Sequence, residues 1–309
     1  MSPATRNDAA WRVLDFTTYT GALTAHEHHL IATRSDAADR QVPVADVSVC
    51  LIGPHVTLTA AAMLLLAHHH VVTLWCDWKG QPLAATHPWS SSTRVTARHR
   101  AQADLPDHVA RRAWAQIVTA KINAQATALD HLNRPGAPTL RRLTRSRIRN
   151  GDPANLEGQA AATYWPHITA TPHFTRAATT CTNAALNYGY GVLRARVIRS
   201  ILTAGLHPPL ALFHRGRSNY FALADDLIEP FRPMVDVRAI RLAAHTPWEP
   251  TGPIPAPVRH ELVALLDEPF TATGHHTDTT MDTFAANLAT LIEHRQPLTV
   301  PIWAPKGAS

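Results

Sequence analysis

The stretch that most constrains both fold and chemistry runs from residue 204 to residue 233 and reads AGLHPPLALFHRGRSNYFALADDLIEPFRP. It groups one histidine, two arginines of a short loop and three acids: His214, Arg215, Arg217, Asp225, Asp226 and Glu229. On a helix, spacings of three and four residues put at least two of the three carboxylates on the same side. Like charges placed so close together require a neutralising partner.

Three interpretations of the acids stay open from spacing alone. They form a solvated acidic face, they pair with an arginine, for which Arg217 and Arg232 are the candidates, or they bind a metal ion. The residues around them are mostly apolar, as in FALADDLIEPF. Burying carboxylates among such residues is costly without a partner, which favours the second and third interpretations.

A metal site would need a further carboxylate, and Glu157 in NLEGQAAATYW is our candidate. One imidazole with two or three carboxylates suits Mg²⁺ or Mn²⁺, and the histidine favours Mn²⁺. Such a cation acts as a Lewis acid at a phosphodiester, and Arg215 and Arg217 would then hold phosphates. His214 also follows the apolar run LALF, a position typical of core histidines that are satisfied by a carbonyl group.

The charge of the chain favours a polyanionic partner. Its 309 residues carry a net charge of +6, and only three of the 29 basic residues are lysine, at positions 79, 121 and 306. Arginine grips two phosphate oxygens at once, although a GC-rich coding bias also raises the ratio of arginine to lysine. The arginines between residues 141 and 149, including Arg145 and Arg149, are typical either of a nucleic-acid groove or of a solvated helix face.

Other motifs narrow the classes of protein. GxxxxGK[ST], HExxH and GxSxG are absent from the sequence, and GYG at residues 189–191 lacks the third glycine of a dinucleotide fingerprint. The three cysteines show no CxxC pairing, which favours a reducing compartment. The apolar run at residues 56–67 is too short for a membrane span, and the N-terminus lacks a signal-peptide pattern. We expect a cytoplasmic protein without a membrane segment.

The pattern along the chain predicts an α+β protein, with a β-rich domain at residues 1–90 and an all-α domain at residues 91–309. In the first, which we expect to be a scaffold or dimer interface, 11–16 and 23–33 are expected to pair as a hairpin, residues 58–70 to form a helix, and 71–76 and 82–89 to form a second hairpin. In the second, Asp152 and Pro153 are expected to start a helix that carries Glu157 in its second turn. A central helix is expected from Asn183 to Gly205, with Arg194, Arg196 and Arg199 off its apolar stripe.

Several of these segments resemble one known family. NLEGQAAATYW, NAALNYGYGVLRA, the 204–233 stretch and WRVLDF are similar, in the same order, to the CRISPR-associated spacer-acquisition integrases, the metal-dependent adaptation endonucleases. The likeness is greatest to their type II branch, runs from residue 11 to about residue 240, and fades beyond Trp248.

The resemblance implies an all-α catalytic domain that binds metal and DNA, a homodimer, and a complex with a second small CRISPR adaptation protein. It implies that the 3′-hydroxyl of a captured double-stranded DNA fragment attacks a phosphodiester at the edge of the repeat array. It places the catalytic metal ligands at Glu157, His214 and Glu229, with Asp225 and Asp226 as supporting or alternative ligands. Two other hypotheses are a structure-selective metal-dependent nuclease and a non-enzymatic DNA-bridging protein.

Overall fold

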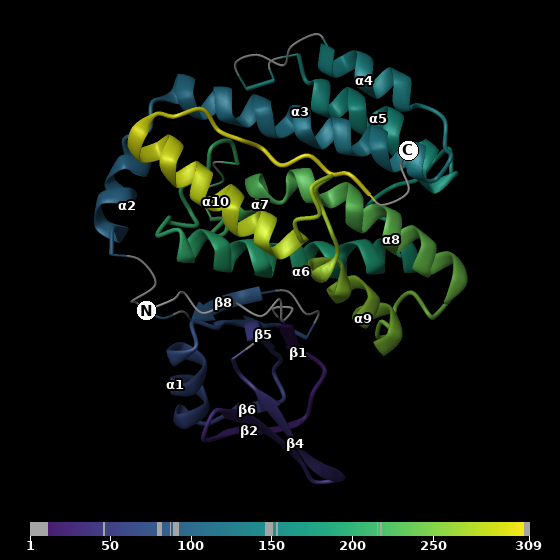
Figure 1. Ribbon diagram of the computed structural model, residues 1–309. Helices are drawn as coiled ribbons and strands as arrows, with labels where there is room; N and C mark the ends of the chain where they lie inside the picture. Colours follow the sequence, from purple (N-terminus) through teal and green to yellow (C-terminus); the bar gives the residue numbers. More distant parts are fainter. Residues whose placement is uncertain are drawn as a thin grey trace. The chain divides into compact units, whose positions relative to one another are not determined.

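The computed structural model describes residues 12–45, 47–78, 82–86, 88, 93–145, 151–152, 154–214, 216 and 218–305. The chain divides into two compact units, residues 1–91 and 92–309. Strands fill the first unit and helices the second (Figure 1), which confirms the predicted α+β class.

The described residues of the first unit form two four-stranded sheets and one helix. The strands are β1 (Arg12–Phe16), β2 (Gly21–His26), β3 (His29–Arg34), β4 (Ala37–Pro43), β5 (Val47–Ile52), β6 (Val56–Leu58), β7 (Val72–Cys76) and β8 (Pro82–Thr86), and the helix is α1 (Ala60–His68). One sheet has the order β1-β5-β7-β8 and the other β4-β3-β2-β6. β5 is buried along its whole length, as expected for an interior strand between two parallel neighbours.

The predicted first hairpin is wrong in its partners. β1 pairs in parallel with β5, with Phe16 opposite Ile52, and joins a different sheet from β2. The hairpin lies instead within residues 21–34, where β2 and β3 run antiparallel and Glu27 takes a left-handed φ of 51° in the turn. The apolar residues of β1 are needed beside the buried β5, so β1 is unavailable for a local hairpin. The second predicted hairpin is confirmed as β7 and β8.

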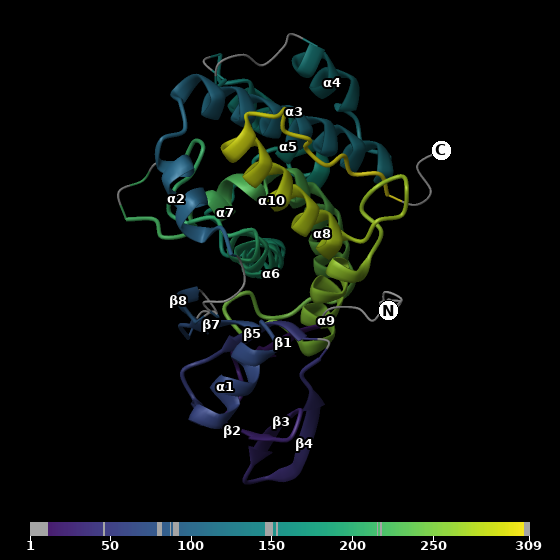
Figure 2. The same cartoon turned by 60° about the vertical axis from the view of Figure 1, so that its left-hand side comes forward.

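The second unit consists of helices. They are α2 (Val95–Ala103), α3 (Asp107–His131), α4 (Ala137–Arg145), α5 (Leu156–Thr169), α6 (Cys181–Thr203), α7 (Ala222–Leu227), the 3₁₀ turn η1 (Glu229–Phe231), α8 (Arg232–His245), α9 (Ala256–Ala264), η2 (Leu265–Asp267) and α10 (Thr277–His294). Within this unit α3 and α6 lie on opposite sides, with α8 and α10 between them, as both views show (Figures 1 and 2). None of the helices among the described residues has the length and apolar character that a membrane crossing requires.

The central helix α6 begins at Cys181, two residues before the expected Asn183. The hydroxyl of Thr180 caps it by accepting from the backbone N–H of Asn183, while the Asn183 amide, inside the helix, donates to carbonyls of the preceding loop. Arg196 and Arg199 lie off the apolar stripe yet are buried, because α8, α9 and α10 all pack against α6. Arg196 is neutralised there by Asp282 of α10, 2.7 Å away.

Candidate active site

Glu157 lies in the first turn of α5, and two upstream side chains hold that turn in place. The carboxylate of Asp152 accepts from the backbone N–H groups of Leu156 at 2.7 Å and of Glu157 at 2.8 Å. Asn155 takes a left-handed φ of 50° and accepts from Gly158 as the N-cap. The expected helix start at Asp152 is therefore three residues early, although Asp152 does satisfy N–H groups of the first turn, as capping side chains do.

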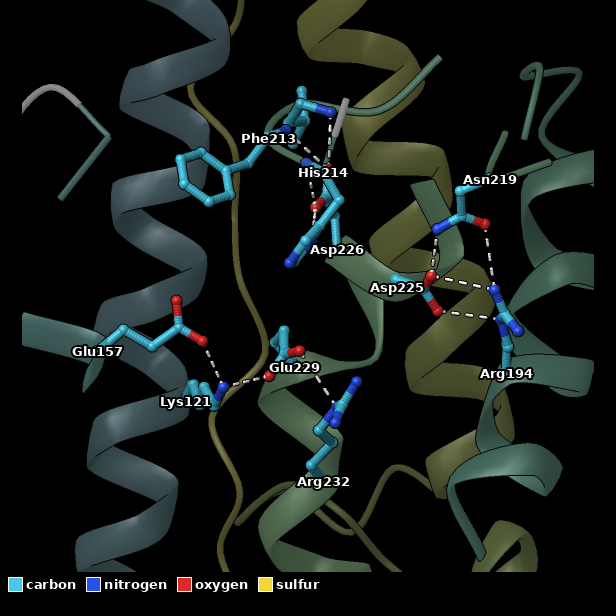
Figure 3. A network of polar contacts seen from close by, with 11 residues as sticks. Lys121, Glu157, Arg194, Phe213, His214, Asn219, Asp225, Asp226, Glu229 and Arg232 are labelled. Atoms are coloured by element: carbon cyan, nitrogen blue, oxygen red, sulfur yellow. Dashed lines mark hydrogen bonds and ion pairs between the residues drawn. The ribbon is translucent and has the colours of Figure 1, made fainter. Parts of the chain in front are cut away.

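Lys121, in the middle of α3, joins Glu157 to Glu229. Its ammonium lies 2.6 Å from Glu157 Oε1 and 2.6 Å from Glu229 Oε2 (Figure 3). Burial by itself would lower the pKa of Lys121, but the charges of Glu229 and Glu157 outweigh burial and raise it. Our sequence reasoning missed this lysine. The signal was a single lysine among the apolar residues of IVTAKINAQA, in a chain that otherwise uses arginine.

Glu229 opens the η1 turn and is almost completely buried, with 3% of its surface exposed. Its Oε1 lies 3.1 Å from Arg232 Nε, so the two oxygens of this carboxylate face two different cations. Burial tends to raise the pKa of Glu229, but Lys121 and Arg232 outweigh it and hold the pKa below its usual value. The Arg232 guanidinium is itself seated over the ring of Tyr190, 4.6 Å from its centroid. Arg232 was one of the two arginines that the sequence proposed as partners for the acids.

Asp226 organises the loop that carries His214. Its fully buried carboxylate accepts from the backbone N–H groups of Leu212, Phe213 and His214 at 2.7, 3.0 and 3.3 Å. It also lies 2.6 Å from His214 Nδ1. This hydrogen bond, acting against partial burial, raises the pKa of His214. Asp226 therefore fixes both the loop and the histidine ring.

The other ring nitrogen of His214 is directed toward the side on which Glu157 and Glu229 lie (Figure 3). The ring edge contacts Trp114, with 5.3 Å between the centroids. Among the residues that the structure describes, no three histidine, cysteine, aspartate or glutamate side chains lie close enough to hold one metal ion together. The two glutamates instead meet on the Lys121 ammonium.

Asp225 belongs to a separate cluster. Arg194 Nε contacts its Oδ1 at 2.9 Å, and Arg194 and the Asn219 amide both donate to its Oδ2, at 3.0 and 2.7 Å. The expectation that neighbouring acids share one helix side is wrong here, because α7 ends at Leu227 and Glu229 opens a new turn. Asp225, Asp226 and Glu229 consequently face three different partners.

The predicted DNA-binding arginines fall mostly outside the described residues. Arg215, Arg217 and Arg149 are not among them. Arg145 is the last residue of α4, and its side chain is exposed.

A second buried polar network, which the sequence did not indicate, joins side chains of α5, α6 and α8. Tyr164 donates to Asp236 at 2.7 Å, and Tyr190 donates to the other oxygen of the same carboxylate. Burial raises the pKa of Asp236 to about 6, although both tyrosine hydrogen bonds act in the opposite direction. Tyr190 also lies beneath Arg232, so this network supports the cation that contacts Glu229.

Comparison with known proteins gives a consistent assignment. The family model described as CRISPR associated protein Cas1 matches residues 16–252. A relative from Neisseria meningitidis serogroup C, named CRISPR-associated endonuclease Cas1, is 36% identical over 72% of this chain and 73% of its own length. A protein of that name from Pyrobaculum aerophilum is 30% identical over 78% of this chain and 84% of its own.

Solved structures share the fold. A Cas1 protein from Thermotoga maritima superposes with a TM-score of 0.73, at 16% identity, over 91% of this chain and 97% of that one. A casposase bound to integration product superposes with a TM-score of 0.70, at 18% identity, over 90% and 89% of the two chains. The family match, over residues 16–252, includes most of the first unit, much of the second and every residue of the candidate site, and the chain belongs to the CRISPR-associated Cas1 family.

Proposed function

We propose that this chain is a divalent-metal-dependent DNA endonuclease and integrase that inserts captured DNA fragments into a CRISPR repeat array. The observation that carries the proposal is the meeting of Glu157 and Glu229 on one cation, the Lys121 ammonium, in a chain of the Cas1 family. Two carboxylates already arranged around a single positive charge, with an imidazole turned toward them, are chemically suited to Mg²⁺ or Mn²⁺.

Glu157, His214 and Glu229 would hold this metal ion. When bound, it supplies Lewis-acid polarisation of a phosphoryl oxygen and stabilises charge at the reacting phosphate. The Asp226 carboxylate accepts a hydrogen bond from Nδ1 of His214 and so keeps the proton there. The lone pair of Nε2, on the side of the two glutamates, is then available to a metal ion. Arg232 and Lys121 keep the buried Glu229 ionised, since their charges lower its pKa. Asp225 and Asp226 are supporting residues in this assignment.

The proposed reaction is a transesterification. The 3′-oxygen of the fragment forms a new bond to phosphorus as it loses its proton, while the bond from phosphorus to the 3′-oxygen of the repeat strand breaks and that oxygen takes up a proton. One phosphodiester replaces another, so no nucleotide cofactor is consumed. With water as the nucleophile, the same site nicks DNA. We propose that Arg215, Arg217, Arg145 and Arg149 contact the DNA phosphates, a role that suits guanidinium groups.

We further propose that the chain works in the cytoplasm as a homodimer, with residues 1–90 as scaffold and dimer interface and residues 91–309 as the catalytic domain. A second small adaptation protein would join two such dimers. A solved Cas6-RT-Cas1–Cas2 complex contains a chain that superposes with a TM-score of 0.74, at 17% identity, over 98% of this chain and 37% of that one. Light scattering on the purified chain, with and without the second protein, tests the proposed assembly.

A strand-transfer assay tests the proposed activity. It uses a duplex fragment with free 3′-hydroxyls and a target that carries the repeat, in Mg²⁺ or Mn²⁺ and in EDTA. Glu157→Ala and His214→Ala are expected to abolish joining and to leave duplex binding within a few-fold of the unmodified chain. Glu261→Ala is the matched control, because this acid is exposed and pairs with Arg238 away from the site.

Each outcome of that assay has a defined meaning. Normal integration by Glu157→Ala or His214→Ala contradicts the site assignment. Metal-dependent cleavage without joining supports the general nuclease instead. Salt-sensitive DNA binding without any metal-dependent product supports a DNA-bridging protein.

A further inference from the structure

We propose that Lys121 is the resident cation of the candidate active site, neutralising Glu157 and Glu229 in the metal-free protein and leaving them when a divalent cation binds. This inference rests on the metal dependence proposed above. It follows from where the lysine lies and from the chemistry of its two partners.

Without Lys121, the negative charges of Glu157 and Glu229 would lie close together with little access to solvent. Glu229 is almost fully buried, and Glu157 is partly buried, with 28% of its side chain exposed. Buried carboxylates that share a site repel each other, and at least one is destabilised unless a cation lies between them. The ammonium, itself only 15% exposed, lies between them at 2.6 Å from one oxygen of each. It therefore holds both carboxylates in place in the absence of metal.

The Lys121 ammonium and a divalent ion cannot both contact the same two oxygens. Mg²⁺ binds carboxylate oxygens at about 2.1 Å, so an ion held by Glu157 Oε1 and Glu229 Oε2 would lie in the space that Lys121 Nζ now fills. Two cations in that space would repel strongly. One of them has to leave, and lysine has a flexible four-carbon stem on which its charge can withdraw.

Lys121 and Arg232, the two cations at Glu229, contact different oxygens of its carboxylate. Arg232 contacts Oε1, not the oxygen that faces Glu157, and it is held over the Tyr190 ring. Glu229 can therefore offer Oε2 to a metal ion while Arg232 stays bound to Oε1. Lys121 is the exchangeable cation and Arg232 the permanent one. Metal ions must then compete with an internal ammonium, which weakens their apparent affinity.

The test measures Mn²⁺ binding to the full-length protein by isothermal titration calorimetry, and thermal unfolding with and without Mn²⁺. Lys121→Met keeps the length of the side chain and removes its charge. It is expected to bind Mn²⁺ at least tenfold more tightly than the unmodified chain. Without metal it is expected to melt at a lower temperature, and with Mn²⁺ to regain a larger part of its stability than the unmodified chain gains.

Two further variants separate charge from packing. Lys121→Met combined with Glu157→Gln removes one acid together with the cation, and is expected to recover the metal-free melting temperature. Arg232→Met is expected to lower stability in both conditions without tightening Mn²⁺ binding. Equal or weaker Mn²⁺ binding by Lys121→Met, while the unmodified chain binds the ion, overturns the inference and leaves the proposed function standing. No Mn²⁺ binding by the unmodified chain overturns both.

Discussion

Two clusters of acids and bases include residues of the segment from α7 to η1, and they differ in how the acids are shared. At Asp225, one carboxylate meets one guanidinium, from Arg194, and the Asn219 amide completes its hydrogen bonding. At Glu229, two carboxylates from distant parts of the chain meet on one small ammonium. The first arrangement gives both oxygens of its acid a donor from Arg194, and Asn219 adds another. The second gathers carboxylates around a position that another cation can take.

Neutralising each acid in turn should separate the two clusters most strongly. Glu229→Gln is expected to reduce strand transfer by about 10³-fold, because the proposed metal site would lose a negative charge and one carboxylate oxygen. Asp225→Asn is expected to stay within about tenfold in activity and to lose about 1–3 kcal/mol of unfolding free energy, because Arg194 is left without its charged partner. Initial rates of joining and urea unfolding of both variants provide the comparison. Equal losses of activity would remove the distinction between the clusters.

Asp226 lies between the two clusters in the sequence and should affect folding more than either neighbour. Asp226→Ala leaves three backbone N–H groups and the His214 ring without their acceptor. Since buried donors that lose their partner are costly, the expected loss is about 3–5 kcal/mol of unfolding free energy. Chemical denaturation measures it. A loss below about 1 kcal/mol would mean that the loop is held by other contacts.

Asp236 gives a smaller effect that depends on pH. Its folded pKa of about 6 lies above the ordinary aspartate pKa of 3.8, so its contribution to stability is full below the lower value and is lost as the pH rises through about 6. Asp236→Asn removes this dependence. The unfolding free energy of the variant minus that of the unmodified chain should be larger at pH 7 than at pH 4.5, by roughly 1–3 kcal/mol. Thermal melts across this range test it, and a constant difference between the two proteins would contradict the raised pKa.

The sequence predicted the order of strands and helices well, because alternation and helical periodicity are local properties. The buried stripe of α6 and the second hairpin both follow from such patterns. The partner of β1 could not be predicted in this way, because Phe16 pairs with Ile52, and the strands β2, β3 and β4 that lie between them in the sequence belong to the other sheet. The mostly apolar sequence of β5 indicates that this strand is buried, but it does not identify the neighbouring strands.

The candidate site shows the same limit. Glu157, His214 and Glu229 were all named from the sequence, and the structure describes each of them in the helical unit. Spacing suggested that Asp225 and Glu229 share one side of a helix, but this rule assumes a continuous helix, and α7 stops at Leu227. Lys121 was missed because its two partners lie far along the chain, and only the packing of α3 against α5 and η1 brings them together.

The location of a bound Mn²⁺ ion is the most direct test of whether Glu157 and Glu229 exchange the Lys121 ammonium for a metal ion. Crystals of the full-length protein grown with Mn²⁺ would reveal the ion by its anomalous scattering. We expect a peak bound by Glu157 and Glu229, with His214 Nε2 turned to it, Lys121 Nζ withdrawn and Arg232 still on Glu229. A peak bound by Asp225 or Asp226, or Lys121 still between the two glutamates beside a bound ion, would contradict it.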